Sequence, residues 1–216
     1  MKALKLTSII FLLTVICIFS QTKTSLQFTG GIISPTHTYK GLIGSVQITY
    51  PLNKTINLYF YSGYSSWDKN KVKILQEWSP IQHETTFTSY SEDNHNLIPI
   101  FVGAKINFHE NKIFTAFINA ELGYSYLTYN YYRNLKEIDP TTGEVLSYYA
   151  DRSSKQIVKE NLWGCGIGIG LSHPLTRKVN LIFEYKLNSY FNSKYSDFFG
   201  PEITWSIFAA GFNVSI

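Results

Sequence analysis

The placement of charge constrains this chain more than any other feature. Eight segments read as β-strands, and together they hold four charged residues among 91. Successive side chains of a strand point to opposite faces of its sheet, and all four charges fall on the less apolar face of their strand. These charged residues are Lys105, Glu121, Glu184 and Lys186. The opposite face carries no charge, which is the pattern of a sheet that contacts lipid.

The segment from Leu97 to Phe108 shows the pattern most clearly. Its charge-free alternate positions are Ile98, Ile100, Val102, Ala104, Ile106 and Phe108. Hydrocarbon cannot hydrogen-bond a free backbone group, so a chain without long apolar helices can cross a membrane only as a closed sheet. The pattern predicts an all-β fold: an eight-stranded, antiparallel, up-and-down transmembrane β-barrel.

Connection lengths support a barrel with two different rims. The predicted strands are Leu26 to Ile33, Gly41 to Tyr50, Ile56 to Gly63, Leu97 to Phe108, Ile113 to Tyr126, Asn161 to His173, Val179 to Tyr190 and Ile203 to Ile216. Short turns follow the second, fourth and sixth strands, whereas the connections after the third and fifth run to about thirty residues. Outer-membrane barrels have short periplasmic turns and long extracellular loops, so both termini are predicted at the periplasmic rim.

The long loops carry signals of their own. Asp139 to Glu144 contains Pro140 and Gly143 and reads as a turn, so the fifth and sixth strands are predicted to continue above the membrane as a hairpin. The segment from Trp67 to Tyr90 can form a second such hairpin. Ser89 to Asn96 is polar and is the part that we expect to be most mobile.

The N-terminus reads as a secretory signal. Lys2 and Lys5 precede an apolar run that ends at Phe19, and Ser20 is a small residue at a cleavage point. We therefore expect residues 1–20 to be removed and residues 21–216 to form one barrel domain. Cys17 lies inside the signal, so Cys165 is the one cysteine of the mature chain and cannot form an intramolecular disulfide. The formal charge of +4 includes both signal lysines and does not indicate a nucleic-acid partner.

The four strand charges are balanced, two basic and two acidic, and they share the predicted lumen. An unpaired buried charge is costly, and side chains nearly fill an eight-stranded barrel. We expect Lys105, Glu121, Glu184 and Lys186 to form a polar network that plugs the lumen. An ion or proton path is the functional alternative.

Aromatic residues gather where the strands should meet the outer head-group layer, and amphipathic rings prefer that interface. The predicted interfacial aromatics are Tyr61, Tyr64, Trp67, Tyr124, Tyr126, Tyr129, Trp163, Tyr190 and Trp205. A sugar-binding platform is the alternative use of such rings.

Four glycines alternate along one predicted strand, at positions 164, 166, 168 and 170. No helix follows them, so they do not read as a nucleotide-binding loop. We expect them to make room in the lumen for inward bulk such as Tyr59, Phe101, Phe117 and Ile182. The five histidines, His37, His83, His95, His109 and His173, are predicted to be solvated residues of loops and strand ends, without metal-ligand spacing or a catalytic partner.

In three places the chain resembles the small outer-membrane β-barrel, or porin-like, proteins of Bacteroidota, which are similar in architecture to the transmembrane barrel of OmpA. Phe19-Ser20-Gln21 resembles their signal end, and Asn96 to Phe108 resembles their central strand. The last strand resembles an assembly signal, with Phe208, Phe212 and Ile216 in register, although such chains commonly end in an aromatic residue. Ile203, Trp205 and Ile207 have the opposite parity, which predicts a bulge near Ala209 or an inward-facing upper half.

The resemblance implies architecture rather than activity. We expect an outer-membrane protein without enzyme activity, cofactor or metal, in contact with outer-membrane lipid. It has a structural or interaction role, at the cell surface or in an envelope secretion complex. A protein partner would bind through the loops Ser65 to Asn96 and Leu127 to Glu160. The alternatives are a narrow solute channel, a lipid-modifying enzyme and a soluble lipocalin-like carrier, and the sequence does not indicate an oligomeric state.

Overall fold

The computed structural model describes residues 24–36, 39–75, 86–111, 113–191 and 203–216. The predicted signal segment, His37 and His83 lie outside these residues. The strands are β1 (Ser25–Pro35), β2 (Gly41–Pro51), β3 (Ile56–Trp67), β4 (Asn70–Leu75), β5 (Thr86–Glu110), β6 (Thr115–Ile138), β7 (Val145–Pro174), β8 (Val179–Tyr190) and β9 (Ile203–Ser215). No helix among the described residues is long and apolar enough to span a bilayer.

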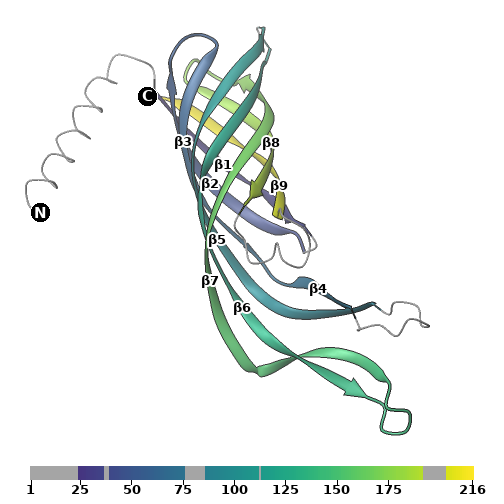
Figure 1. The fold of residues 1–216 in the computed structure, drawn as a ribbon. Coiled ribbons are helices and arrows are strands. Elements are labelled where there is room, and N and C mark those ends of the chain that lie inside the picture. The colour runs from purple at the N-terminus through teal and green to yellow at the C-terminus, as the bar shows by residue number, and fades with distance from the viewer. Residues whose placement is uncertain (1–23, 37–38, 76–85, 112, 192–202) are drawn as a thin grey trace, which may run out of the picture.

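Eight of these strands close into a ring. The sheet order is β3-β2-β1-β9-β8-β7-β6-β5-β4. An additional pairing between β3 and β5 closes the ring and leaves β4 outside it as a partner of β5. All neighbours are antiparallel. The predicted eight-stranded, up-and-down barrel is therefore confirmed. Figure 1 shows the ring at one end of the molecule.

The three short turns at one end of the barrel use the same local device. In the β2–β3 turn, the side-chain oxygen of Asn53 accepts hydrogen bonds from the backbone N–H groups of Thr55 and Ile56, both at 2.8 Å. Asn111 does the same in the β5–β6 turn, and the Thr176 hydroxyl does so in the β7–β8 turn. Asn and Thr favour such turns because their short side chains reach the nearby backbone. This end is called the short-turn end below.

The two faces of the ring have the chemistry that the alternation predicted. Val102 is 60% exposed on the outside, whereas Phe101 and Lys105 are 0% and 5% exposed inside. Large apolar side chains are exposed on the outside of every ring strand, among them Phe28, Val46, Phe60, Val102, Leu122, Ile167, Phe183 and Phe212. A soluble lipocalin-like carrier keeps its apolar face inside, so that alternative is wrong.

β5, β6 and β7 continue far beyond the ring at the other end. The expected hairpin is confirmed: β6 and β7 stay paired up to Ile138 and Val145, and the amide N–H of Gly143 donates to the carbonyl of Asp139 in the turn. β4 pairs with the first part of β5, from Thr86 to Glu92. These two extensions, called the β6–β7 arm and the β4–β5 arm below, diverge from each other in Figure 1.

The segment Ser89 to Asn96 does not form the loose loop that its polarity suggested. It belongs to β5, and Ser91, Glu92, Asp93 and His95 are all buried. Asp93 accepts hydrogen bonds from Asn130 and Tyr132 of β6, and His95 Nδ1 lies 2.9 Å from the carbonyl oxygen of Asp68. Polarity here marks buried contacts rather than exposure to solvent.

β9 distinguishes the two alternatives for the last strand, a bulge near Ala209 and an inward-facing upper half. Its register against β1 runs without a shift from Trp205 to Ser215, so there is no bulge near Ala209. Trp205, Ile207 and Ala209 are 2%, 6% and 6% exposed and point into the barrel. The inward-facing upper half is therefore the correct alternative.

Candidate functional site

The four strand charges lie together inside the barrel, but they do not pair evenly. Lys186 Nζ lies 2.9 Å from Glu121 Oε2 and 3.8 Å from Glu184 Oε1. Lys105 instead donates to Gln27 Oε1 at 3.0 Å, and no carboxylate of the described residues lies within 4.0 Å of its ammonium. One lysine therefore serves both acids, which charge balance alone could not predict.

Neutral donors complete the coordination of the two carboxylates. Tyr59 donates to Glu121 Oε2 at 2.8 Å, and Asn188 donates to Glu121 Oε1 at 2.9 Å. Asn119 donates to Glu184. Buried charges are tolerated where ion pairs and hydrogen bonds replace water, so these contacts stabilise the polar layer of the lumen.

The alternating glycines leave room for the side chains of this polar layer, although only some of the neighbouring side chains are those that were expected. A Cβ atom at Gly166 would lie 2.9 Å from Cγ of Glu121, and one at Gly170 would lie 2.3 Å from Cζ of Phe117. Phe117 is thus the bulky residue that was correctly expected there. Tyr59 packs against Gly103 instead, since a Cβ at Gly103 would lie 2.6 Å from its ring.

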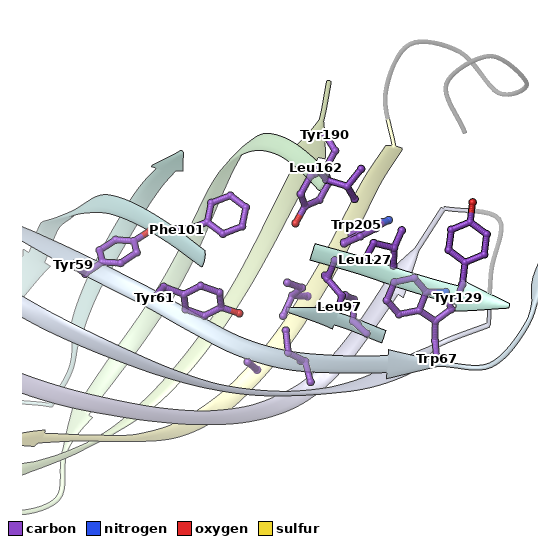
Figure 2. Packing of buried hydrophobic residues seen from close by; sticks show 14 residues of the cluster. Tyr59, Tyr61, Trp67, Leu97, Phe101, Leu127, Tyr129, Leu162, Tyr190 and Trp205 are labelled. Carbon is purple, nitrogen blue, oxygen red and sulfur yellow. The ribbon is translucent and has the colours of Figure 1, made fainter. Parts of the chain in front are cut away.

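Five of the nine predicted interfacial aromatics were assigned to the wrong face. Tyr61, Trp67, Tyr129, Tyr190 and Trp205 are at most 6% exposed and belong to the buried cluster drawn in Figure 2. Their parity matches that of the inward residues of their strands, so they cannot face the head groups. Tyr190, for example, shares the parity of Glu184 and Lys186, which was the signal available in the sequence.

The other aromatics do lie on the outside of the barrel or at its margin. Tyr64 and Trp163 are 52% and 60% exposed, and the rings of Tyr124 and Trp163 pack edge to face with centroids 5.4 Å apart. Tyr126 is half-buried.

The buried rings form a continuous series above the polar layer. Ring centroids lie 6.3 Å apart for Phe101 and Tyr190, 4.5 Å for Tyr190 and Trp205, and 5.3 Å for Trp205 and Trp67. Aliphatic side chains of the same cluster, including Leu97, Leu127 and Leu162, are at most 1% exposed (Figure 2). The lumen thus changes from a charged layer to an apolar layer along the barrel axis.

The prediction that His95 is a solvated loop residue is wrong. His95 is fully buried and stacks between Trp67 and Tyr129, with both ring centroids at 5.1 Å. Its Nδ1 lies 2.9 Å from the carbonyl oxygen of Asp68, and its Nε2 lies 3.6 Å from Glu92 Oε2. His95 shares the parity of Leu97 and Lys105, so extending the alternation beyond the predicted strand would have placed it inside. His109 and His173 are exposed, as expected.

Asp93 joins the two arms at the point where they diverge. Its carboxylate accepts hydrogen bonds from Asn130 at 2.9 Å and Tyr132 at 3.2 Å, and Arg152 Nη1 lies 2.6 Å from Oδ2. Burial favours the neutral acid, but the hydrogen bonds from Asn130, Arg152 and Tyr132 hold the pKa of Asp93 below its ordinary value. The carboxylate is therefore charged at neutral pH.

A bulge in β7 brings Arg152 to this position. The β6–β7 register shifts between Tyr131 and Arg133, where β7 has additional residues around Arg152. The guanidinium also lies over the Tyr132 ring, 4.3 Å from its centroid. Bulges redirect side chains in this way.

Among the described residues, no group of three or more His, Cys, Asp or Glu side chains could hold a metal ion.

The closed ring, its apolar outside and its charged inside define an integral outer-membrane β-barrel protein. Solved structures share this fold. The chain resembles Neisserial surface protein A with a TM-score of 0.55 and 17% identity, over 89% of this chain and 97% of that one. It resembles a major outer membrane protein of Thermus thermophilus with a TM-score of 0.53 and 14% identity, over 89% and 99% of the two chains. No protein-family model matches the sequence, and no curated protein matches it.

Proposed function

We propose that this protein is a non-conducting and non-catalytic barrel that presents its two arms to a protein partner outside the cell. Residues 1–20 act as a cleaved signal, the short-turn end faces the periplasm, and the arms face the exterior. The assignment to the Bacteroidota group is part of this proposal and rests on the sequence resemblance described above. The partner is a cell-surface or secretion-complex protein.

The observation that carries the proposal is the exposed apolar surface of the β6–β7 arm. Ile138, Leu146 and Tyr149 are 54%, 55% and 51% exposed on a ribbon beyond the ring. An isolated two-stranded ribbon is marginally stable in water, so contact with a partner would stabilise it. The Asp93–Arg152 contact holds the base of this arm in place for such an encounter.

Two features support a lumen that does not conduct. The polar layer contains charges that already have partners, and the series of buried rings lies directly above it. A narrow solute channel needs a continuous water-filled bore, which either layer would interrupt.

A lipid-modifying enzyme is disfavoured by the same geometry. Such an enzyme needs catalytic groups that reach the bilayer from the outer rim. Asp93 is held by Arg152, and His95 is stacked between two rings inside the barrel. These contacts give both side chains a structural role and do not present them to the bilayer as catalytic groups.

Photo-crosslinking in intact cells tests the interaction role. A photoreactive residue at Leu146, which is 55% exposed on the arm, should give a discrete protein adduct. The same residue at Phe183, 43% exposed on the outside of the ring, should give lipid adducts. Equal protein adducts at both sites, or none at Leu146, would reject the proposed partner.

Planar-bilayer recording tests the closed lumen separately. The purified barrel should show no discrete conductance steps. Steps that disappear on changing Lys105 or Glu184 would establish the channel alternative instead.

A further inference from the structure

A polar cavity of about 170 Å³ opens inside the short-turn end of the barrel. Each of the eight ring strands contributes at least one residue to its lining. Asn57, Asn107, Asn180 and Asn213 supply four carboxamides, and seryl and threonyl hydroxyls come from β1, β2, β6 and β7. Lys105 is the one charged residue among the described residues of this lining. The cavity is called the vestibule below.

The ammonium group of Lys105 has hydrogen-bonding capacity to spare. Lys105 is 5% exposed, and its Nζ contacts Gln27 Oε1 at 3.0 Å and lies 4.2 Å from the centroid of the Phe117 ring. A lysine ammonium has three N–H donors, and the described residues provide one oxygen acceptor for them. A buried ammonium is stabilised by an anion or by water that occupies its remaining donors.

The two lumen carboxylates are already occupied by other donors. Lys186, Tyr59 and Asn188 coordinate Glu121, and Asn119 donates to Glu184. These acids belong to the polar layer and do not line the vestibule. Lys105 is therefore left as the cationic residue of a lining that is otherwise neutral and consists of polar side chains together with Phe117 and Ile182.

The carboxamides can add further donors. Each Asn side chain has an NH₂ group, and rotation by 180° exchanges it with the oxygen. The Oδ1 of Asn213 is buried without a hydrogen-bond partner among the described residues, so no such contact holds the amide in its present orientation. One cation surrounded by neutral donors is an arrangement that suits an anion.

We propose that the vestibule binds a small oxyanion, with Lys105 Nζ as its charged contact and the surrounding carboxamides as neutral donors. The volume limits the ligand to one carboxylate or one inorganic phosphate. Such a group reaches the vestibule either as a free anion or as the C-terminal carboxylate of a peptide. The site lies at the end opposite to the arms and is independent of their proposed partner.

Calorimetric titration of the refolded mature barrel tests the site. Acetate and inorganic phosphate should bind saturably, with affinities in the order of millimolar, typical of a single charged contact. Lys105→Met should weaken binding at least about tenfold. Lys178→Met is the matched control, because Lys178 is an exposed lysine of the β7–β8 turn outside the vestibule, and it should leave binding unchanged.

A second variant separates binding from folding. Asn57→Asp keeps Lys105 but places a competing carboxylate in the vestibule, and it should also weaken binding about tenfold. A short peptide with a free C-terminus should bind if the physiological source is a peptide, whereas its amidated form should not. Binding of acetate or phosphate without the peptide would assign the site to free anions.

Two results would overturn the proposal. One is the absence of saturable binding for acetate, phosphate and the peptide, which would leave the vestibule as a hydrated cavity. The other is an equal loss of affinity for Lys178→Met and Lys105→Met, which would indicate diffuse attraction to the basic turn.

Discussion

Arg152 Nη1 lies 2.6 Å from Asp93 Oδ2, and this salt bridge joins β7 to β5 where the two arms leave the barrel. Asp93 is nearly buried, whereas half of the Arg152 side chain is exposed. The pair is therefore screened on one side, and exposed ion pairs of this kind contribute about 0.2–1 kcal/mol. The Asp93 carboxylate also accepts hydrogen bonds from Asn130 and Tyr132, so it joins β5 to β6 as well as to β7.

Asp93→Asn should loosen the base of the β6–β7 arm without unfolding the ring. The variant loses the charge that attracts Arg152, so amide exchange near Tyr132 should accelerate about two- to fivefold. Hydrogen exchange read by mass spectrometry measures this change. Asp139→Asn, in the exposed turn at the tip of the arm, is the control and should alter exchange only near the turn. Unchanged exchange near Tyr132 in Asp93→Asn would show that the salt bridge does not hold the arm.

The same contact predicts a pH dependence. The pKa of Asp93 is lower in the folded protein than its ordinary value of 3.8, so the carboxylate stabilises the arm above that value. Stabilisation should be lost as the pH falls through the lowered pKa. Protection near Tyr132, corrected for intrinsic exchange rates, should stay constant from neutral pH to about pH 4 and fall in stronger acid. Asp93→Asn should lack this acid transition.

Removing Lys186 should cost far more stability than removing Lys105. Lys186→Met leaves Glu121 and Glu184 buried without a cation, and breaking a buried pair in this way costs about 3–5 kcal/mol. Lys105→Met breaks one hydrogen bond to a neutral side chain and should cost clearly less. Unfolding in guanidinium chloride, followed by tryptophan fluorescence, compares the two variants. Equal losses of unfolding free energy in the two variants would mean that Lys105 and Lys186 contribute equally to stability.

An arginine on the outside of the ring should impair assembly, whereas an equally exposed arginine on the arm should not. Val102 and Ile157 are 60% and 67% exposed, but only Val102 lies in the apolar surface of the ring. Val102→Arg should destabilise the barrel by about 2–4 kcal/mol because the charge faces hydrocarbon. Ile157→Arg should be nearly neutral. Heat-modifiable gel mobility after refolding distinguishes them, and similar folded fractions would contradict the membrane face.

Gly103→Ser would be a misleading control for that experiment. Strand alternation alone makes it a mild change in the lumen. The ring of Tyr59 would lie 2.6 Å from a Cβ at this position, so the substitution would disturb core packing.

Strand alternation predicted the barrel well because membrane and lumen impose opposite chemistry on successive residues. It placed Val102 outside and placed Lys105 and Glu121 inside. It could not assign lumen partners, because pairing depends on the stagger between strands. Thus Lys186 binds both acids while Lys105 binds Gln27.

The arms were harder to predict because both faces of an extension in water can carry polar residues. β5 begins at Thr86 rather than Leu97, and His95 is buried there among aromatic rings. For the aromatics, position along the strand was a poorer guide than parity. Trp163 and Trp205 were both predicted at the interface, yet one faces outward and the other inward.

These two tryptophans give the most direct test of which side of the sheet meets lipid. Variants that retain a single tryptophan, Trp163 or Trp205, are refolded into vesicles whose acyl chains carry bromine, a short-range quencher of tryptophan fluorescence. Trp163, 60% exposed on the outer surface, should be strongly quenched, whereas Trp205, 2% exposed inside the barrel, should be nearly unaffected. Quenching of Trp205 without quenching of Trp163 would contradict the assignment of faces.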